Sequence, residues 1–120
     1  MKFKSFSHWK EKLQEYGNTD NIYILVEGKK DESVLKNWHI KNVISLKGKR
    51  FYDVVEEMEL VNLCIILVDI DKQGEKIFQK IRFLLEREGI PTDISFREYL
   101  KNFSIKEIEE LPLLEAGGIH

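Results

Sequence analysis

Two carboxylates follow directly after an apolar run in the middle of the chain. Residues 63–68 are apolar and rich in β-branched side chains, and Asp69 and Asp71 come immediately after them. Such a run is typical of a buried strand in a parallel sheet. Residues i and i+2 of an extended backbone point to the same face, so both carboxylates can reach one ion. Gly74 then allows the turn from which the next helix begins.

The same design occurs earlier in the chain. Residues 22–26 form another apolar run of strand length, and Glu27 and Gly28 follow it at once. In an open parallel sheet, ligands bind outside the carboxyl ends of the strands, where the strand order reverses. If these two strands are neighbours, Glu27 therefore converges with Asp69 and Asp71 at one edge of the sheet.

Three converging carboxylates predict a divalent-cation site. Magnesium prefers oxygen ligands and commonly takes one or two carboxylates while keeping water in its other positions. Asp69 and Asp71 supply that number, and like charges this close favour a compensating cation. We therefore expect Mg²⁺, with Mn²⁺ as a substitute, to polarise a phosphodiester and activate water. Glu27 would act as general acid or base, or complete a second metal site.

Basic residues stand close to these acids in the sequence. Formal net charge is −2, so any nucleic acid must be bound by local basic clusters against a slightly repulsive background. A basic loop precedes the helix expected after residue 50, and its alternative role is that of an ordinary solvated loop. The residues predicted to contact phosphate are Lys29, Lys30, Lys47, Gly48, Lys49, Arg50 and Lys72.

The two acidic motifs resemble those of a known domain family. Glu-Gly-x-x-Asp from Glu27 and Asp-x-Asp-x-x-Gly from Asp69, each directly after a hydrophobic strand, are similar to the motifs of the Toprim domain of topoisomerases, primases and small nucleases. More narrowly, the whole chain resembles stand-alone archaeal Toprim proteins related to the 5S rRNA maturase ribonuclease M5. The motifs cover residues 21–90, and Ile70 stands where family members often carry proline or tryptophan.

The resemblance implies a role for each matching residue. Glu27 would perform acid/base work, and Asp69 and Asp71 would bind magnesium. RNA would be a substrate more readily than DNA. Asp31 matches an acid of the ribonuclease M5-like members, although an Asp that opens a helix is as often its N-cap. The accessory positions implied in this way are Gly28, Asp31 and Gly74.

Strands alternate with helices from residue 22 to residue 95. This pattern predicts an α/β domain with a four-stranded parallel sheet and right-handed crossovers. A strand order of 2-1-3-4, which the resemblance also implies, makes it Toprim-like and Rossmann-like. The strands are expected at residues 22–26, 43–46, 63–68 and 93–95. An N-terminal helix at residues 5–16 and short C-terminal helices within residues 96–112 flank this core.

The boundaries of the last elements follow from local chemistry. A capping box that begins at Ser104 would open the final helix, and Leu111 and Pro112 would end it. Residues 115–120 have no periodicity and are expected to be mobile.

Length and composition bound the class of protein. The chain has 120 residues, which is one domain with a motif-bearing core at residues 21–95. Its 42% hydrophobic and 33% charged residues are typical of a soluble globular protein. Cys64 is the only cysteine and cannot form an internal disulfide. No apolar run is long enough for a membrane span. We therefore expect a cytoplasmic protein without a membrane partner.

Other acid-bearing motifs fit less well. An EF-hand loop beginning at residue 69 would have Lys80 at its twelfth position, where a bidentate acid is required, and Gln73 at its fifth. A phosphatase with a nucleophilic aspartate does not fit Gln73 and Gly74, and a receiver domain needs an acidic pair where Glu27 and Gly28 stand.

Three functions remain open. The first is a magnesium-dependent nuclease, and the second is a non-catalytic module that binds nucleic acid or a ribonucleoprotein. The third is a phosphoryl enzyme that acts on small molecules. The near-neutral net charge leaves room for a protein or ribonucleoprotein partner, and the sequence does not indicate an oligomeric state.

Overall fold

The computed structural model describes residues 2–115. We expected residues 115–120 to be mobile, and residues 116–120 of that segment lie outside the described residues. Within residues 2–115, no helix combines the length and the apolar character needed to cross a membrane. The strands are β1 (Ile22–Val26), β2 (Val43–Ser45), β3 (Leu63–Ile66) and β4 (Thr92–Asp93). The helices are α1 (Phe6–Gly17), α2 (Lys29–Asn37), α3 (Phe51–Glu57), α4 (Lys72–Arg87), α5 (Ser95–Leu100), the 3₁₀ helix η1 (Ile108–Glu110) and α6 (Leu111–Glu115).

The four strands form one parallel sheet in the order β2-β1-β3-β4. The predicted α/β class and strand order are therefore confirmed. Ile24 of β1 pairs with Val43 of β2 on one side and with Ile65 of β3 on the other. Because β1 and β3 are hydrogen-bonded neighbours, the segments that follow them emerge side by side at the carboxyl edge of the sheet. This fold is consistent with the Toprim-like and Rossmann-like class.

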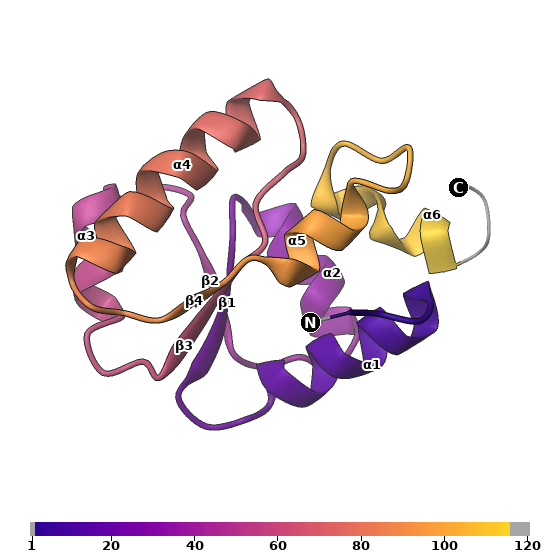
Figure 1. Ribbon diagram of the computed structural model, residues 1–120, viewed down its shortest axis with the longest axis horizontal. Coiled ribbons are helices and arrows are strands. Elements are labelled where there is room, and N and C mark those ends of the chain that lie inside the picture. Colours follow the sequence, from indigo (N-terminus) through magenta and orange to yellow (C-terminus); the bar gives the residue numbers. More distant parts are fainter. Residues whose placement is uncertain (1, 116–120) are drawn as a thin grey trace.

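Helices lie on both faces of the sheet (Figure 1), and each face buries its own apolar layer. Alternate residues of a strand point to opposite faces, so Ile24 and Leu25 belong to different layers. Helices α3 and α4 cover one face through Val54, Phe78 and other buried side chains. Helices α1, α2, α5 and α6 cover the other face. Both faces of the central strands are thus buried, which explains their nearly continuous apolar sequence.

The C-terminal elements differ from the sequence prediction. The last strand, β4, ends at Asp93, and α5 begins at Ser95, whose backbone N–H donates to the Asp93 side chain. Beyond α5, Pro112 lies in the first turn of α6 instead of ending a helix. Proline is tolerated there because the N–H groups of a first turn have no helical partner. The N-cap of η1 is Glu107, whose backbone N–H donates to the side chain of Glu110.

Candidate functional site

The predicted carboxylates meet at the carboxyl edge of the sheet. Glu27 follows β1, Asp69 and Asp71 follow β3, and all three line one cavity of about 570 Å³. The Oε1 atom of Glu27 accepts a hydrogen bond from the backbone N–H of Asp69 at 3.0 Å. This bond joins the two acidic segments directly. The other residues lining this cavity are Gly28, Lys29, Lys30, Asp31, Leu46, Lys47, Phe51, Gln73, Ile77, Glu107 and Glu109.

Backbone N–H groups hold the two aspartates in place. Asp69 Oδ1 accepts from the N–H of Ile108 at 2.9 Å. Asp71 is the N-cap of α4, and its Oδ1 accepts from the N–H of Gly74 at 2.7 Å. Hydrogen bonds from N–H groups to a charged carboxylate are among the stronger ones in proteins. Each carboxylate is therefore oriented through one oxygen atom, and its second oxygen is left for another ligand.

Asp31 has a capping role. It is not the N-cap of α2 but the third helical residue, and its Oδ2 accepts from the backbone N–H of Gly28 at 3.1 Å. The side chain is buried, with 6% of its surface exposed. It therefore brings a fourth carboxylate close to the other three, while its hydrogen bond fixes the start of α2 beside Glu27.

The acids raise one another's pKa values. Burial raises the pKa of Asp69 to about 7, and the nearby Asp31, Glu27 and Asp71 carboxylates add to this effect against the hydrogen bond from Ile108. Burial also raises the pKa of Glu27, which the N–H of Asp69 opposes. Burial is the main cause of the raised pKa of Asp31 as well. A bound cation would relieve this desolvation and repulsion.

Gly74 is required by a close approach of two segments. A Cβ atom at this position would lie 2.1 Å from the backbone oxygen of Asp69 and 3.0 Å from Glu27 Oε1. Real Cβ atoms do not approach a backbone oxygen that closely, so any other residue would push α4 away from the acidic loop. The glycine therefore keeps Asp71, the N-cap of α4, close to Glu27 and Asp69.

The donor set suits a hydrated divalent cation. Apart from the amide of Gln73, the side-chain oxygens that line the cavity are those of carboxylates, which magnesium prefers, and the cavity leaves room for water. Within residues 2–115, however, no three His, Cys, Asp or Glu side chains are arranged to hold a metal ion together. The cavity therefore suits an ion that binds one or two carboxylates, such as those of Asp69 and Asp71, and keeps water in its other coordination positions.

The predicted phosphate-contacting residues divide into two groups. Lys29, Lys30 and Lys47 line the acid cavity, and Lys30 lies 4.0 Å from Glu109. The rest of the basic loop is engaged elsewhere. Lys49 pairs with Glu57 at 3.3 Å and Arg50 with Asp53 at 3.0 Å, while Gly48 adopts a left-handed conformation and does not line the cavity. Lys72 lines a separate shallow surface along α4.

A buried arginine that the sequence reasoning missed supports the acidic loop. Arg97 of α5 has no exposed surface, and its Nε and Nη2 donate to the backbone oxygens of Val68 and Asp69 at 3.1 and 2.7 Å. Its Nη1 lies 2.9 Å from a Glu75 carboxylate oxygen, in an ion pair without hydrogen-bond geometry. The guanidinium also lies 4.4 Å from the centre of the Phe78 ring. Arg97 thus fixes the backbone from which Asp69 projects.

The segment after α5 also contributes to the site. Ile108 donates to Asp69, the backbone oxygen of Lys106 accepts from the N–H of Ile70 at 2.7 Å, and Glu107 and Glu109 line the cavity. No local motif marks these contacts, because they join segments far apart in the chain. The one sequence feature that indicates a special role is Arg97 itself, an arginine next to Phe96 on the apolar stripe of a short helix.

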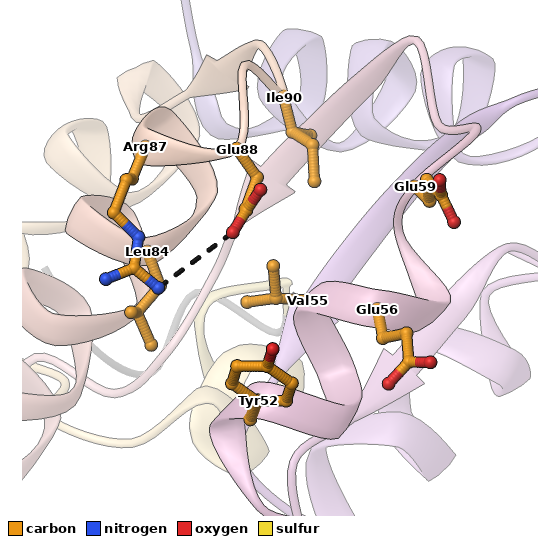
Figure 2. A pocket seen from close by; sticks show the side chains of 8 residues that line it. All are labelled: Tyr52, Val55, Glu56, Glu59, Leu84, Arg87, Glu88 and Ile90. Carbon is orange, nitrogen blue, oxygen red and sulfur yellow. Dashed lines mark ion pairs between the residues drawn. The ribbon is translucent and has the colours of Figure 1, made fainter.

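A second cavity lies between α3 and α4 (Figure 2). Its volume is about 450 Å³. None of the predicted site residues lines it. Residues of α3 stand on one side of it and residues at the end of α4 on the other. Its lining residues are Tyr52, Val55, Glu56, Glu59, Leu84, Arg87, Glu88 and Ile90.

Comparison with known proteins supports the fold and leaves the activity open. No protein-family model matches the chain. It is similar to UPF0292 proteins of archaea. The one from Pyrococcus horikoshii is 29% identical over 108 residues, which is 89% of this chain and 79% of the relative. The one from Thermococcus gammatolerans is 29% identical over 113 residues, which is 91% of this chain and 82% of the relative.

Two solved structures also resemble the chain. The first is a protein from Aquifex aeolicus whose description gives no function. It has 42% sequence identity and a TM-score of 0.84, and the match covers 89% of this chain and 98% of that protein. The second contains the zinc-binding and RNA polymerase domains of the Aquifex aeolicus primase. It has 27% identity and a TM-score of 0.52, over 92% of this chain but 28% of the primase chain. The second likeness agrees with a Toprim-like fold.

Proposed function

We propose that this protein is a magnesium-dependent enzyme that cleaves phosphodiester bonds in nucleic acid, and specifically a nuclease of the ribonuclease M5 kind that acts on structured RNA. The observation that carries this proposal is the convergence of Glu27, Asp69 and Asp71 on one cavity, where a 3.0 Å hydrogen bond joins the two acidic segments. The likeness to a primase structure supports a nucleic acid as the substrate.

Each residue of the cavity has a role in the proposed reaction. A divalent cation bound by Asp69 and Asp71 would supply positive charge for the transition state and lower the pKa of its bound water. Glu27 Oε1 accepts from the N–H of Asp69, which leaves Oε2 to take or give a proton. Burial raises the pKa of Glu27 above its ordinary value, which is the direction that acid/base work requires. Lys29 and Lys47 line the same cavity and would bind the phosphates on either side of the scissile bond.

Substitution of the carboxylates tests the proposal. Asp69→Asn and Glu27→Gln keep the size of each side chain but remove the charge, and each should reduce magnesium-dependent cleavage of a structured RNA by about 10²-fold or more. Asp20→Asn and Glu11→Gln change exposed acids outside the cavity and serve as matched controls. Circular dichroism and thermal melting would show that all four variants fold. Cleavage by either site variant at the wild-type rate would refute the assignment.

A non-catalytic binding module is the second candidate. It is favoured by the structural roles that two of the acids already have: Asp71 is the N-cap of α4, and Asp31 fixes the start of α2, so neither needs a catalytic role to explain its presence. Such a site would hold a hydrated cation for docking phosphate without providing a nucleophile. This candidate predicts that magnesium strengthens binding of RNA or DNA, that Asp69→Asn removes the strengthening, and that no substrate yields a product. Cleavage that is lost in Asp69→Asn excludes it.

A further inference from the structure

Helix α4 carries an excess of positive charge. It has five basic and two acidic residues, whereas the adjacent α3 has three acidic residues and no basic one. Both acids of α4 are engaged: Glu75 pairs with the buried Arg97, and Glu86 pairs with Arg82 at 2.9 Å. The remaining cations of α4 therefore stand out on a protein whose net charge is −2.

These cations lie along one exposed stripe of the helix. Lys72, Lys76 and Lys80 follow each other at intervals of four residues, and Phe83 and Arg87 continue the same line, as expected for one helical face. We call these five residues the α4 stripe. Four of them, Lys72, Lys76, Lys80 and Phe83, line one shallow surface.

The lysines of the α4 stripe have no acidic partners. Within residues 2–115, neither Lys72, Lys76 nor Lys80 forms an ion pair, and Lys80 instead lies 5.2 Å from the centre of the Phe51 ring. Some exposed cations elsewhere are paired. Lys49 and Lys101, for example, lie 3.3 and 3.0 Å from glutamate oxygens. The α4 stripe therefore presents free positive charge, which is what an anionic ligand needs.

The α4 stripe begins at the acid site and leads away from it. Lys72 directly follows Asp71, the N-cap of α4. At about 1.5 Å per residue, the distance from Lys72 to Arg87 is about 22 Å. That length corresponds to about six or seven nucleotide steps of about 3.4 Å each. A polymer that touches both the acid cavity and the stripe would thus be held over several phosphates.

We propose that the α4 stripe binds a single strand of nucleic acid and guides it into the acid cavity. Phosphates would lie against the lysines. A base would stack on Phe83, which is 63% exposed and has the Arg87 guanidinium 6.0 Å from its ring centre. Arg87 also lies 3.9 Å from Glu88. This inference rests on the proposed function only in taking the bound strand as the substrate, because strand binding itself can be measured without cleavage.

The first test removes two charges from the α4 stripe. Binding of a labelled single-stranded oligouridylate and of the equivalent DNA is followed by fluorescence anisotropy in EDTA over a range of salt concentrations. In the Lys76→Ala/Lys80→Ala variant, affinity should fall and the slope of log K against log salt should become shallower by about 1.4, at about 0.7 per lost contact with a single strand. Lys2→Ala/Lys41→Ala removes the same charge from exposed positions outside the α4 stripe and should leave both quantities unchanged.

The second test concerns the single strand. Phe83→Ala should weaken binding of the oligouridylate about tenfold and leave binding of an RNA duplex unchanged, because only unpaired bases can stack on the ring. Leu60→Ala, which truncates a side chain that is 86% exposed, is the control. Equal loss with single strand and duplex, or no loss at all, would overturn the role of the aromatic ring.

Two outcomes separate this inference from the proposed function. If the protein cleaves RNA with magnesium but the double lysine variant keeps the wild-type salt slope, the α4 stripe is not the path of the strand. If no cleavage occurs and the slope still changes as expected, the stripe binds nucleic acid and the proposed enzymatic function fails. Equally tight binding of polyglutamate would show that the surface selects any polyanion, which overturns a nucleic-acid strand as its occupant.

Discussion

The acid site and the α3/α4 cavity both contain several carboxylates, but they hold them differently. In the acid site, Asp69 and Asp71 are partly buried, and backbone N–H groups of distant or capping residues orient them. In the α3/α4 cavity, Glu56 and Glu59 are exposed, and their side chains make no hydrogen bond or ion pair with any residue from 2 to 115. The two regions therefore differ in how far their acids are fixed, more than in the number of acids.

This difference indicates which region can perform chemistry. Catalysis depends on groups that are held in position before the substrate arrives, and an exposed flexible glutamate must be ordered at the moment of reaction. Burial near other carboxylates also keeps the pKa of Asp69 at about 7, close to working pH. A cavity whose acids are exposed to solvent lacks both properties, although its volume of about 450 Å³ would admit a small ligand.

The largest loss of stability and activity is expected from adding a side chain at Gly74, where α4 approaches the acidic loop most closely. Gly74→Ala would place a Cβ atom 2.1 Å from the Asp69 backbone oxygen, so α4 must shift. We expect the free energy of unfolding to fall by about 1–3 kcal/mol, as in other overpacked sites, and metal-dependent cleavage to be lost. Urea denaturation and a cleavage assay would measure the two effects.

Gly28→Ala is the matched control for this substitution. Its Cβ atom would come no closer than 3.9 Å to a neighbouring atom, which is an ordinary contact, and the backbone of Gly28 is extended. This variant should fold and cleave nearly as the wild type does. If the two variants lose activity equally, close packing at Gly74 is not what holds the acid site together.

A smaller effect is expected from removing one backbone donor. Ile108→Pro deletes the N–H that Asp69 accepts, at the first position of η1, where proline is tolerated; Glu107 before it is already extended. A hydrogen bond to a charged group contributes about 1.5–3 kcal/mol, so magnesium affinity should fall by about tenfold or more. Ile108→Val keeps the N–H and most of the side chain. If calorimetry gives the two variants equal magnesium affinities, the N–H of Ile108 does not orient Asp69 for metal binding.

The fold and the meeting of the acids could be predicted from local patterns. Two apolar runs marked the central strands, and their adjacency followed from the strand order that the motifs imply. Glu27 and Asp69 then had to emerge at the same edge of the sheet. The ion pair of Arg50 with Asp53 was also open to prediction, since residues three apart on a helix turn are neighbours.

The support of the acid site could not be predicted in this way. The contacts of Asp69 with Arg97 and Ile108 join residues 28 and 39 positions apart. They exist because α5 and η1 pack against the same sheet face, which depends on the whole apolar layer rather than on a local pattern. An N–H donor is present at nearly every residue, so no residue type distinguishes Ile108. The boundaries of the last elements were misplaced for a related reason, because Glu110 caps a turn that Ser104 was expected to open.

The pH dependence of stability distinguishes the two regions further. The pKa of Asp69 is about 7 in the folded protein against an ordinary value of 3.8, and the pKa values of Glu27 and Asp31 are raised as well. Between pH 3.8 and about pH 7, Asp69 therefore keeps a proton in the folded protein that it has released in the unfolded chain. These three carboxyl groups should therefore contribute most to the free energy of unfolding below about pH 4, and their contribution should fall as the pH rises to about 7.

Urea denaturation in EDTA at about pH 5 and about pH 8 measures this dependence. Asp69→Asn cannot titrate and should flatten the difference, whereas Glu56→Gln should leave it unchanged. Magnesium should act in the opposite direction, because metal binding requires deprotonated carboxylates, and should stabilise the wild type more at the higher pH. A wild-type protein whose stability rises over this range would contradict the cause assigned to the acid cluster.

The smallest effect is expected in the α3/α4 cavity. Glu56→Gln/Glu59→Gln removes two exposed charges that form no hydrogen bond or ion pair with residues 2–115, so the free energy of unfolding should change by less than about 0.5 kcal/mol. Cleavage and magnesium affinity should also stay at wild-type levels, because these exposed charges belong to a separate cavity and are screened by salt. The corresponding double substitution in the acid site, Asp69→Asn/Asp71→Asn, should abolish both cleavage and magnesium binding. If the cavity variant also lost activity, anchoring by the backbone would not be what separates reactive carboxylates from ordinary ones in this fold.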